Sequence, residues 1–394
     1  GFFRQSCGTQ LTELQRYATN GDENRLFFAQ GEGSIPSPQA LVEKGIKLFF
    51  GVGHETTGAT TYTQADISNL LAWIDLNPAE HQAVIDATSL LGAMPWDDSV
   101  VEQLLSKCNL FMPFQKAIGG ISGYYVISLT PHAINLIDKN QQDPSWAIPR
   151  QLKIAVSKDG SLPLSSEKTT ALGPIYDPSI DAMQGGIINT YSTLAFAETT
   201  FSILRNERNI GDVKVLNQRS SENRDIVNNW IAQNPLFELG VTDINARGAA
   251  VTLLKVTDSD IDDNDVHQRI VAKSKQLLGY EGITHIDGSH EKGLDVARYV
   301  NAFPGSPGDY RAWIGGIRPH ADITALLDNI NYCYLRAKAA VIDELLQEAG
   351  EQSEAKLQSA IDTASEQRFD DPKRAYKVLI ADLVGMVFNA QGDA

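Results

Sequence analysis

The chain has 394 residues, 42% of them hydrophobic, which is enough for two or three domains with their own cores. Its net charge of -16 and its lack of a Lys/Arg cluster argue against a nucleic-acid-binding protein. No apolar run approaches the roughly 18 residues that indicate a membrane span, and no secretion signal is visible. Cys7, Cys108 and Cys333 lie far apart without CxxC spacing, which disfavours zinc or disulfides and favours a reducing cytoplasm.

The first part of the sequence alternates short apolar runs with apolar residues at helical spacing. The predicted strands are 46–52, 83–87, 110–114 and 124–129, and the helices between them are 67–75 and 100–107. This rhythm indicates βαβ units and a mainly parallel sheet. Since ligands bind beyond the carboxyl ends of strands in such sheets, polar residues just after strands are the first functional candidates.

The rest of the sequence changes character twice. Residues 141–186 are rich in Pro, Gly, Ser and Asp, which predicts a long excursion over the surface or over the site. A helix at 192–205 then leads out of the first domain. An α+β pattern follows, with helices at 219–233, 265–278 and 323–346 and strands at 249–256, around 284 and at 312–315. We therefore predict a large domain over 1–205, a small α+β domain over 206–347, and a helical extension over 348–394.

Lys116 ends an apolar strand and is followed at once by a glycine-containing turn, in Leu110-Phe-Met-Pro-Phe-Gln-Lys116-Ala-Ile-Gly-Gly120. A lysine that points into a cleft can become the amine of a Schiff base. Strand-end lysines that point into solvent are common, however, so this position alone favours the simpler interpretation.

Asp86 ends the preceding predicted strand and is followed by two hydroxyl residues, in Ala83-Val-Ile-Asp86-Ala-Thr88-Ser89. Pyridoxal phosphate (PLP) needs a carboxylate against its pyridine nitrogen, which keeps the ring protonated and able to accept electrons. Asp86 precedes Lys116 by one strand–helix–strand interval, which would put both at one edge of a parallel sheet. The alternative is an aspartate that caps a turn or a helix.

Three further segments carry candidate residues. In Gly51-Val-Gly53-His54-Glu55-Thr56-Thr57-Gly58, the hydroxyls would suit a cofactor's ring oxygen, although an ordinary turn explains the segment equally. Asn189 and Thr190 precede a helix and would otherwise be capping residues. Arg311 lies on a short predicted strand, where it would bind a carboxylate in bidentate fashion or form a surface ion pair.

Taken in order over roughly residues 1–345, these segments resemble the class V aminotransferases, which are fold type I PLP enzymes. Within that group the resemblance is closest to divergent branches of the phosphoserine aminotransferases. The segments that carry it are His54-Glu-Thr-Thr-Gly58, Asp86-Ala-Thr-Ser89, Pro95-Trp-Asp97, Phe114-Gln-Lys116, Asn189-Thr190 and Tyr310-Arg-Ala-Trp313.

The resemblance implies an α/β fold with a large PLP domain and a role for each matching residue. Lys116 would be the Schiff-base lysine and proton carrier, and Asp86 would pair with the pyridine nitrogen. Thr56 would bond the ring oxygen, and Arg311 would hold the substrate α-carboxylate. The PLP phosphate would be held by Thr88 or Ser89 with Gln115, and by Asn189 and Thr190 from the neighbouring subunit of a homodimer with shared active sites. The reaction would pass an amino group from glutamate to 3-phosphohydroxypyruvate, giving phosphoserine for serine biosynthesis.

The sequence also departs from the family pattern. The Gly-rich phosphate loop, the aromatic residue that stacks on the ring and a His-Arg pair precede these segments in the family, and no counterpart is found here. We therefore expect either an incomplete gene product or a reduced homologue with weakened PLP binding. Arg298 and Arg318 are the candidates for the substrate phosphate, and residues 348–394 match nothing in the family.

Three alternatives remain open beside this assignment. One is another class V member, such as a serine–glyoxylate aminotransferase. A cysteine desulfurase is disfavoured, because Cys333 lies in a predicted helix and Cys108 beside a strand. The third is a binding or scaffold protein that keeps the fold without catalysis.

Overall fold

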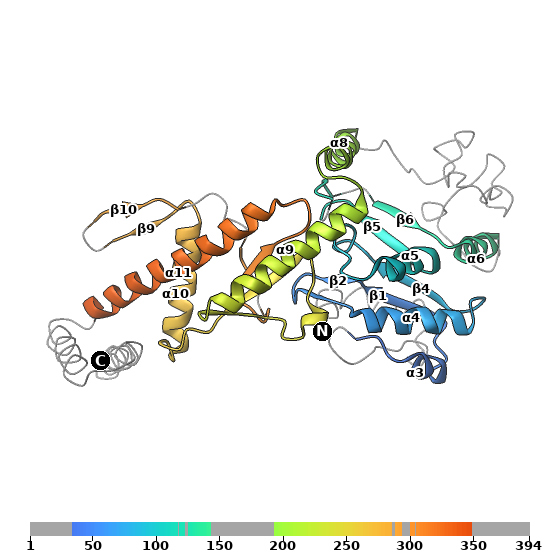
Figure 1. Cartoon of the computed structure of the whole chain (residues 1–394), viewed down its shortest axis with the longest axis horizontal. Coiled ribbons are helices and arrows are strands. Elements are labelled where there is room, and N and C mark those ends of the chain that lie inside the picture. Colours follow the sequence, from blue (N-terminus) through green and yellow to red (C-terminus); the bar gives the residue numbers. More distant parts are fainter. Residues whose placement is uncertain are drawn as a thin grey trace.

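The computed structural model describes residues 34–142 and 193–348, except 117, 123–124, 286–287, 294–299 and 304. The described part forms two lobes joined by the long helix α9 (Val213–Gln233), as Figure 1 shows. The predicted excursion after residue 142 and the predicted extension after residue 348 lie outside the described residues.

The first lobe contains a four-stranded sheet in the order β1-β4-β5-β6. Its strands are β1 (Leu48–Val52), β4 (Gln82–Asp86), β5 (Asn109–Pro113) and β6 (Tyr125–Ser128). The first three run parallel and β6 runs antiparallel to β5, which confirms the prediction of a mainly parallel sheet. Each strand lies within a residue or two of its predicted bounds.

Helices α4 (Gln64–Leu76) and α5 (Asp98–Lys107) lie between these strands in the chain, as predicted. A capping box starts α4: the Thr63 hydroxyl accepts a hydrogen bond from Asp66 N, and the Asp66 carboxylate accepts one from Thr63 N. The buried side of α4, with Leu70 and Trp73 fully enclosed, packs in the core of this lobe. Three more helices belong to this half of the described chain, namely α3 (Pro38–Glu43), α6 (Pro131–Gln142) and α8 (Thr193–Asn209).

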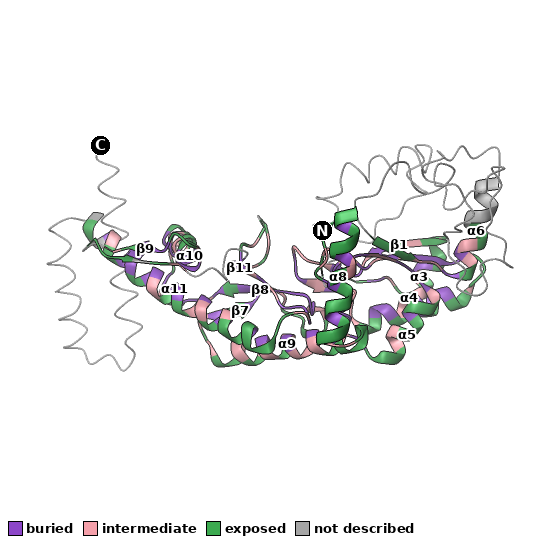
Figure 2. Ribbon diagram, turned by 90° about the horizontal axis from the view of Figure 1, so that it is seen from above, coloured by how far each residue is buried: buried purple, intermediate pink, exposed green. Residues whose placement is uncertain are grey.

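The second lobe has an antiparallel sheet in the order β11-β8-β7. Its strands are β7 (Phe237–Leu239), β8 (Val251–Val256) and β11 (Tyr310–Trp313), and a short 3-10 helix, η3 (Ile244–Ala246), precedes β8. Helices α10 (Asn264–Leu278) and α11 (His320–Glu348) and the hairpin of β9 (Ile283–Thr284) and β10 (His290–Glu291) complete it. These elements confirm the predicted α+β pattern, and buried residues recur along α11 in Figure 2.

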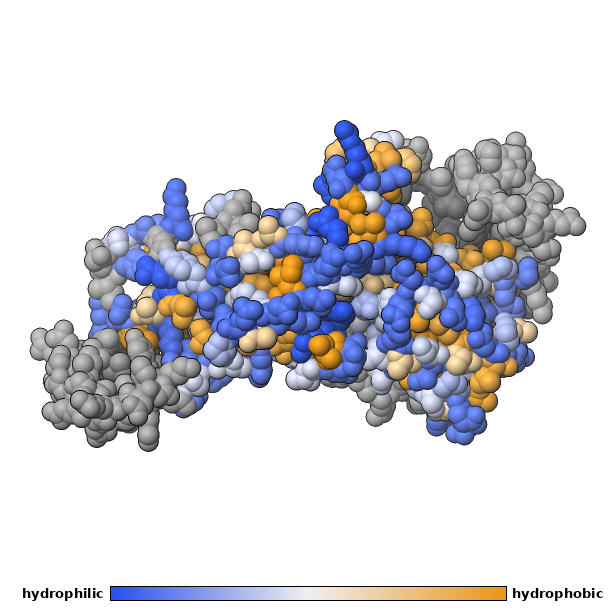
Figure 3. Space-filling model, in the orientation of Figure 1, coloured by the Kyte–Doolittle hydropathy of each residue, from blue (hydrophilic) through white to orange (hydrophobic). Residues whose placement is uncertain are grey.

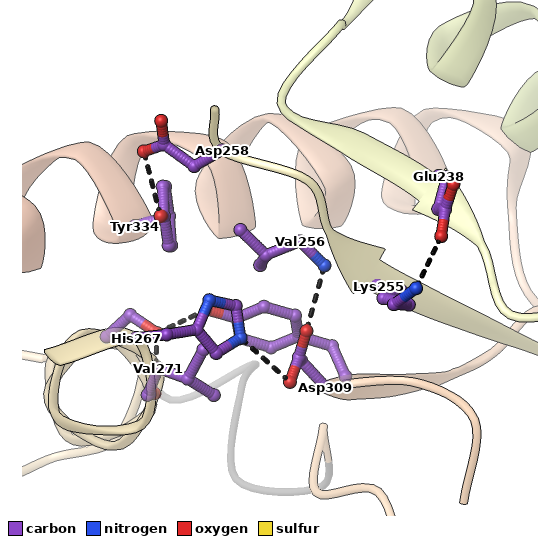
Figure 4. Close-up of polar contacts among 10 residues, drawn as sticks. Glu238, Lys255, Val256, Asp258, His267, Val271, Asp309 and Tyr334 are labelled. Carbon is purple, nitrogen blue, oxygen red and sulfur yellow. Dashed lines mark hydrogen bonds and ion pairs between the residues drawn. The ribbon is translucent and has the colours of Figure 1, made fainter. Parts of the chain in front are cut away.

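Buried polar contacts hold the second lobe together. The Tyr334 hydroxyl donates to the Asp258 carboxylate at 2.9 Å (Figure 4). Lys338 forms an ion pair with the same carboxylate at 2.8 Å. Burial alone would raise the pKa of Asp258, but its hydrogen bonds, first the one from Lys338, bring that pKa below the usual value. In the same view His267 Nε2 lies 3.4 Å from Asp309, so α10 is tied to the start of β11.

The two lobes contact each other at a hairpin formed by β2 (His54–Glu55) and β3 (Thr60–Thr61). Gly248 N, from the second lobe, donates to the Ala59 carbonyl in the hairpin turn at 2.9 Å. His54 is 4% exposed and packs on Gly248 so closely that a Cβ there would lie 2.2 Å from its ring. Position 248 therefore has room only for glycine while His54 keeps its place.

Burial lowers the pKa of His54 to about 4, and neither ring nitrogen has a hydrogen-bond partner among the described residues. In the unfolded chain this pKa is about 6.5, so the folded state favours the neutral ring. Its contribution to stability is complete above about pH 6.5 and is lost as the pH falls towards 4.

We therefore predict that the free energy of unfolding falls by about 2–3 kcal/mol between pH 7.5 and 4.5 through His54 alone. Urea titrations at both pH values measure the fall, and His54→Leu should reduce it by that amount. The variant His290→Leu, which removes an exposed histidine, should leave the fall unchanged. An equal fall in the wild type and in His54→Leu would show that His54 does not resist protonation.

Candidate functional site

The carboxyl ends of three parallel strands meet at one edge of the first sheet. Asp86, the last residue of β4, lies opposite Val52 of β1 and Phe111 of β5. Lys116 follows three residues after β5 ends at Pro113. The structure thus places Asp86 and Lys116 beyond the ends of adjacent parallel strands, at the edge where ligands bind in such sheets.

A tight turn carries Lys116 away from β5. The Lys116 carbonyl accepts a hydrogen bond from Gly119 N at 2.9 Å, and Gly120 N donates to the Phe114 carbonyl at 2.8 Å. Gly119 has φ +72°, a conformation that disfavours residues with a side chain. The Lys116 side chain is exposed, so its amine is open to a small molecule.

Helix α8 holds this turn from outside. Asn206 Nδ2 donates to the Ile118 carbonyl at 2.7 Å, and the Ser202 hydroxyl donates to the Gly119 carbonyl at 3.1 Å. Both side chains are buried, and both carbonyls belong to the turn that follows Lys116. Neither residue was predicted from the sequence, because a polar residue inside a helix carries no signal for a partner more than 80 positions away.

Asp86 closes a turn of its own while keeping one oxygen available. Its Oδ1 accepts hydrogen bonds from Thr88 N at 2.9 Å and from the Thr88 hydroxyl. Among the described residues, Oδ2 accepts no hydrogen bond. Asp86 can therefore close the turn through Oδ1 and bind a ligand through Oδ2. The Thr88 hydroxyl already has a hydrogen-bond partner, because it donates to Asp86. Ser89, the next residue, is buried.

Gln115 lies between the strand and Lys116 and is half-buried. Its Oε1 is buried and has no hydrogen-bond partner in the described part of the chain. A buried amide oxygen without a partner is costly, so this atom marks a place where a donor is missing.

Thr56 lies in the turn between β2 and β3, and a carboxylate fixes that turn. Glu55 accepts hydrogen bonds from Thr57 N at 2.9 Å and from Gly58 N at 2.7 Å, one on each oxygen. The Ser306 hydroxyl of the second lobe donates to the Thr57 carbonyl at 2.8 Å. Sequence reasoning selected Thr56 but not Glu55, whose role depends on the turn that it closes.

Arg311 of β11, in the second lobe, lies close enough to Glu55 of this turn for the two charges to interact. Its guanidinium lies over the Phe303 ring, 4.2 Å from the ring centroid. Burial lowers the pKa of Arg311, and the negative charge of Glu55 partly offsets that effect. No carboxylate among the described residues lies within ion-pair distance of Arg311, so the guanidinium retains its capacity for a carboxylate ligand.

The other predicted residues fall into two groups. Asn189, Thr190 and Arg298 lie outside the described residues. Arg318 is exposed in the loop before α11, and its own carbonyl accepts a hydrogen bond from Asn223 Nδ2 at 3.2 Å. Among the described residues, no hydrogen bond or ion pair joins Arg318 to Asp86 or Lys116, although the adjacent Ile317 side chain lies near Gly119 in the turn that follows Lys116.

Both described cysteines are buried. Burial raises the pKa of Cys108 to about 12, and Cys333 is enclosed in α11. A buried thiol with a raised pKa is a poor nucleophile. Within the described ranges, no His, Cys, Asp and Glu group has an arrangement that would hold a metal ion. No helix there is long and apolar enough to cross a membrane.

Comparison with known proteins gives matches of structure only. No protein-family model and no curated protein matches the sequence. Among solved structures, a phosphoserine aminotransferase from Cytophaga hutchinsonii matches with a TM-score of 0.44 and 13% identity, over 78% of this chain and 67% of that one. A phosphoserine aminotransferase from Bacillus circulans subsp. alkalophilus matches with a TM-score of 0.44 and 15% identity, over 73% and 60%.

A pyridoxamine-pyruvate aminotransferase from Mesorhizobium loti matches with a TM-score of 0.45 and 14% identity, over 80% of this chain and 71% of that one. The chain thus spans about 60–70% of the length of these proteins. Matches of this size give no support to a particular activity, which has to come from the residues themselves. The described chain is an α/β protein whose structure matches class V, fold type I aminotransferases at low sequence identity.

Proposed function

We propose that this protein binds PLP at the carboxyl edge of β1, β4 and β5 and acts as an aminotransferase. One observation carries the proposal: Asp86 ends β4 and Lys116 follows the end of the adjacent parallel strand β5, while Arg311 lies within electrostatic reach of Glu55 in the turn that follows β2. A carboxylate, an amine and a guanidinium are the groups that PLP-dependent chemistry on an amino acid needs. The sequence resemblance supports the same assignment for each of the three residues.

The residues at the edge fit PLP in their chemistry. Lys116 offers an exposed amine that would hold the cofactor covalently, and Asp86 keeps Oδ2 for the protonated pyridine nitrogen. When bound, PLP supplies the electron sink that weakens the bonds to the substrate Cα. Lys116 Nζ would then take the proton from that carbon.

Arg311 and Glu55 would form the part of the site that binds the substrate. A guanidinium binds a carboxylate in bidentate fashion, and the partial burial of Arg311 strengthens that contact. Because both oxygens of Glu55 are held by backbone N–H groups, its charge stays near Arg311 without closing the site. Arg311 thus stays charged and free to take an α-carboxylate.

The finer assignment within the proposal is phosphoserine aminotransferase, with glutamate as amino donor and 3-phosphohydroxypyruvate as acceptor. It rests on the resemblance in sequence and not on a contact in the structure. A serine–glyoxylate aminotransferase is the alternative within the same class. Amino transfer from alanine but not from glutamate would favour that alternative.

Lys116 tests cofactor binding directly. We predict that the purified protein mixed with PLP develops the visible absorption band of a lysine Schiff base. Borohydride reduction and peptide mass spectrometry should place the modified lysine at 116. Lys116→Ala should lose both signals, while Lys107→Ala, which removes a lysine paired with Asp75 on the surface, should keep them.

A wild-type protein without the band at saturating PLP would contradict catalysis by this chain. It would instead favour a binding or scaffold protein, for which Asp86 only closes its own turn with Thr88.

Arg311 tests substrate binding. In Arg311→Gln, glutamate should discharge the visible band only at concentrations at least about 10-fold higher, because a charge-assisted hydrogen bond of about 1.5–3 kcal/mol is lost. Stopped-flow absorbance measures this half-reaction without the amino acceptor. Arg269→Gln, at a partly exposed ion pair with Glu344, should behave as the wild type. An unchanged glutamate dependence in Arg311→Gln would exclude the proposed role.

The proposal includes a homodimer, and the outer face of α8 supports it. Leu194, Phe201 and Leu204 lie on one side of that helix and are 70%, 63% and 56% exposed. Figure 3 shows apolar surface gathered over α8. An exposed apolar patch of this kind usually marks an interface, and a second copy of the chain would cover it by twofold symmetry.

We predict that Phe201→Asp converts a dimer into a monomer, because the new charge would be buried in the interface. Sedimentation velocity distinguishes one chain of 43.0 kDa from two. Asn209→Asp adds the same charge at an exposed position of α8 and should leave the dimer intact. A monomeric wild type would contradict the proposed assembly.

A further inference from the structure

A pocket in the second lobe contains two arginine side chains. It is small, is partly open to solvent, and lies between helix α9 and the segment that leads into β8. Arg224 comes from the helix and Arg247 from that segment, while Ala59 and Gly248, which join the two lobes, line the wall between them. The edge with Asp86 and Lys116 is not part of this pocket.

The two arginines differ in how they are held. Arg247 is fixed by hydrogen bonds from Nε to the Val241 carbonyl at 2.9 Å and from Nη1 to the Asn228 side chain at 2.9 Å. Arg224 makes no hydrogen bond or ion pair among the described residues, and its Nε is buried without a partner. The fixed arginine has a structural role, whereas the donors of Arg224 are unused.

The charges of the pocket are unbalanced. Burial and then the neighbouring Arg224 guanidinium lower the pKa of Arg247, and Asp243 offsets only part of this. No carboxylate among the described residues lies within 4 Å of either guanidinium. The chain has a net charge of -16, so acidic residues are plentiful. The two arginines nevertheless share a pocket in which their positive charges repel each other.

We propose that Arg224 and Arg247 form a binding site for a small oxyanion, a phosphate or a carboxylate, in this pocket. Such an anion would accept from the terminal N–H groups of Arg224, which make no hydrogen bond among the described residues, would offset the repulsion between the guanidiniums and would fit the planar fork that arginine presents. The pocket also touches the hairpin turn through Ala59, so the bound anion would tighten the contact between the lobes. This site is independent of the proposed PLP chemistry.

Thermal unfolding in the Lys116→Ala background tests the site without interference from PLP. Sodium phosphate should raise Tm by about 2 °C or more over sodium chloride of equal ionic strength, since a ligand that binds only the folded state stabilises it. The same measurement with sodium malonate tests whether a carboxylate also raises Tm. A rise with phosphate alone assigns a phosphate site, and a rise with both anions assigns a general oxyanion site.

Arg224→Gln should abolish the rise and, in chloride, should unfold at the same temperature as its parent or higher, because repulsion is removed. Lys214→Gln is the matched control: it removes one positive charge from the exposed side of the same helix and should keep the full response. The proposal fails if neither anion raises Tm beyond chloride, or if Arg224→Gln responds like its parent. A markedly lower Tm of Arg224→Gln in chloride would assign Arg224 a structural role instead. Isothermal titration of phosphate into both proteins gives the same comparison without heating.

Discussion

The close contact between His54 and Gly248 is the constraint on which the proposed site depends. It brings the hairpin of the first lobe against the segment that enters β8, and the Ala59 carbonyl is held there by Gly248 N. Through this contact the turn with Glu55 and Thr56 comes within electrostatic reach of Arg311, which belongs to a strand some 250 residues later. An imidazole without hydrogen-bond partners is a costly group to bury, so packing must supply the compensating free energy.

A second constraint acts on the other side of the same edge. The parallel register of β1, β4 and β5 aligns the ends of the strands, and α8 then holds the turn that carries Lys116 through Asn206 and Ser202. The amine is therefore displayed on a fixed turn while its own side chain stays exposed. Fixed backbone with an accessible reactive group is the arrangement that a covalent cofactor site requires.

In the second lobe, a buried charged group that has partners contributes to the structure, whereas one without partners suggests a ligand site. Lys338 is enclosed by Asp258 and Asp260, so its charge is neutralised where it is buried. Arg224 lies in the same lobe without such a partner, which is why the pocket and not the ion-pair cluster suggests a ligand. Arg311 is intermediate, since it has the Phe303 ring and the nearby charge of Glu55 but no ion pair among the described residues.

The sequence by itself predicted the main strands and helices of both lobes, the mainly parallel sheet, and the positions of Asp86 and Lys116 at the carboxyl ends of adjacent strands. These follow from apolar periodicity and from chain order, which are local properties. The sequence did not predict α3, α6, β7 or the β2–β3 hairpin. Only the tertiary structure decided that Asn206 holds the Lys116 turn, that Glu55 lies near Arg311, and that Arg224 shares a pocket with Arg247. Each of these contacts joins residues from separate elements, and no local pattern encodes which polar side chains will meet when the elements pack.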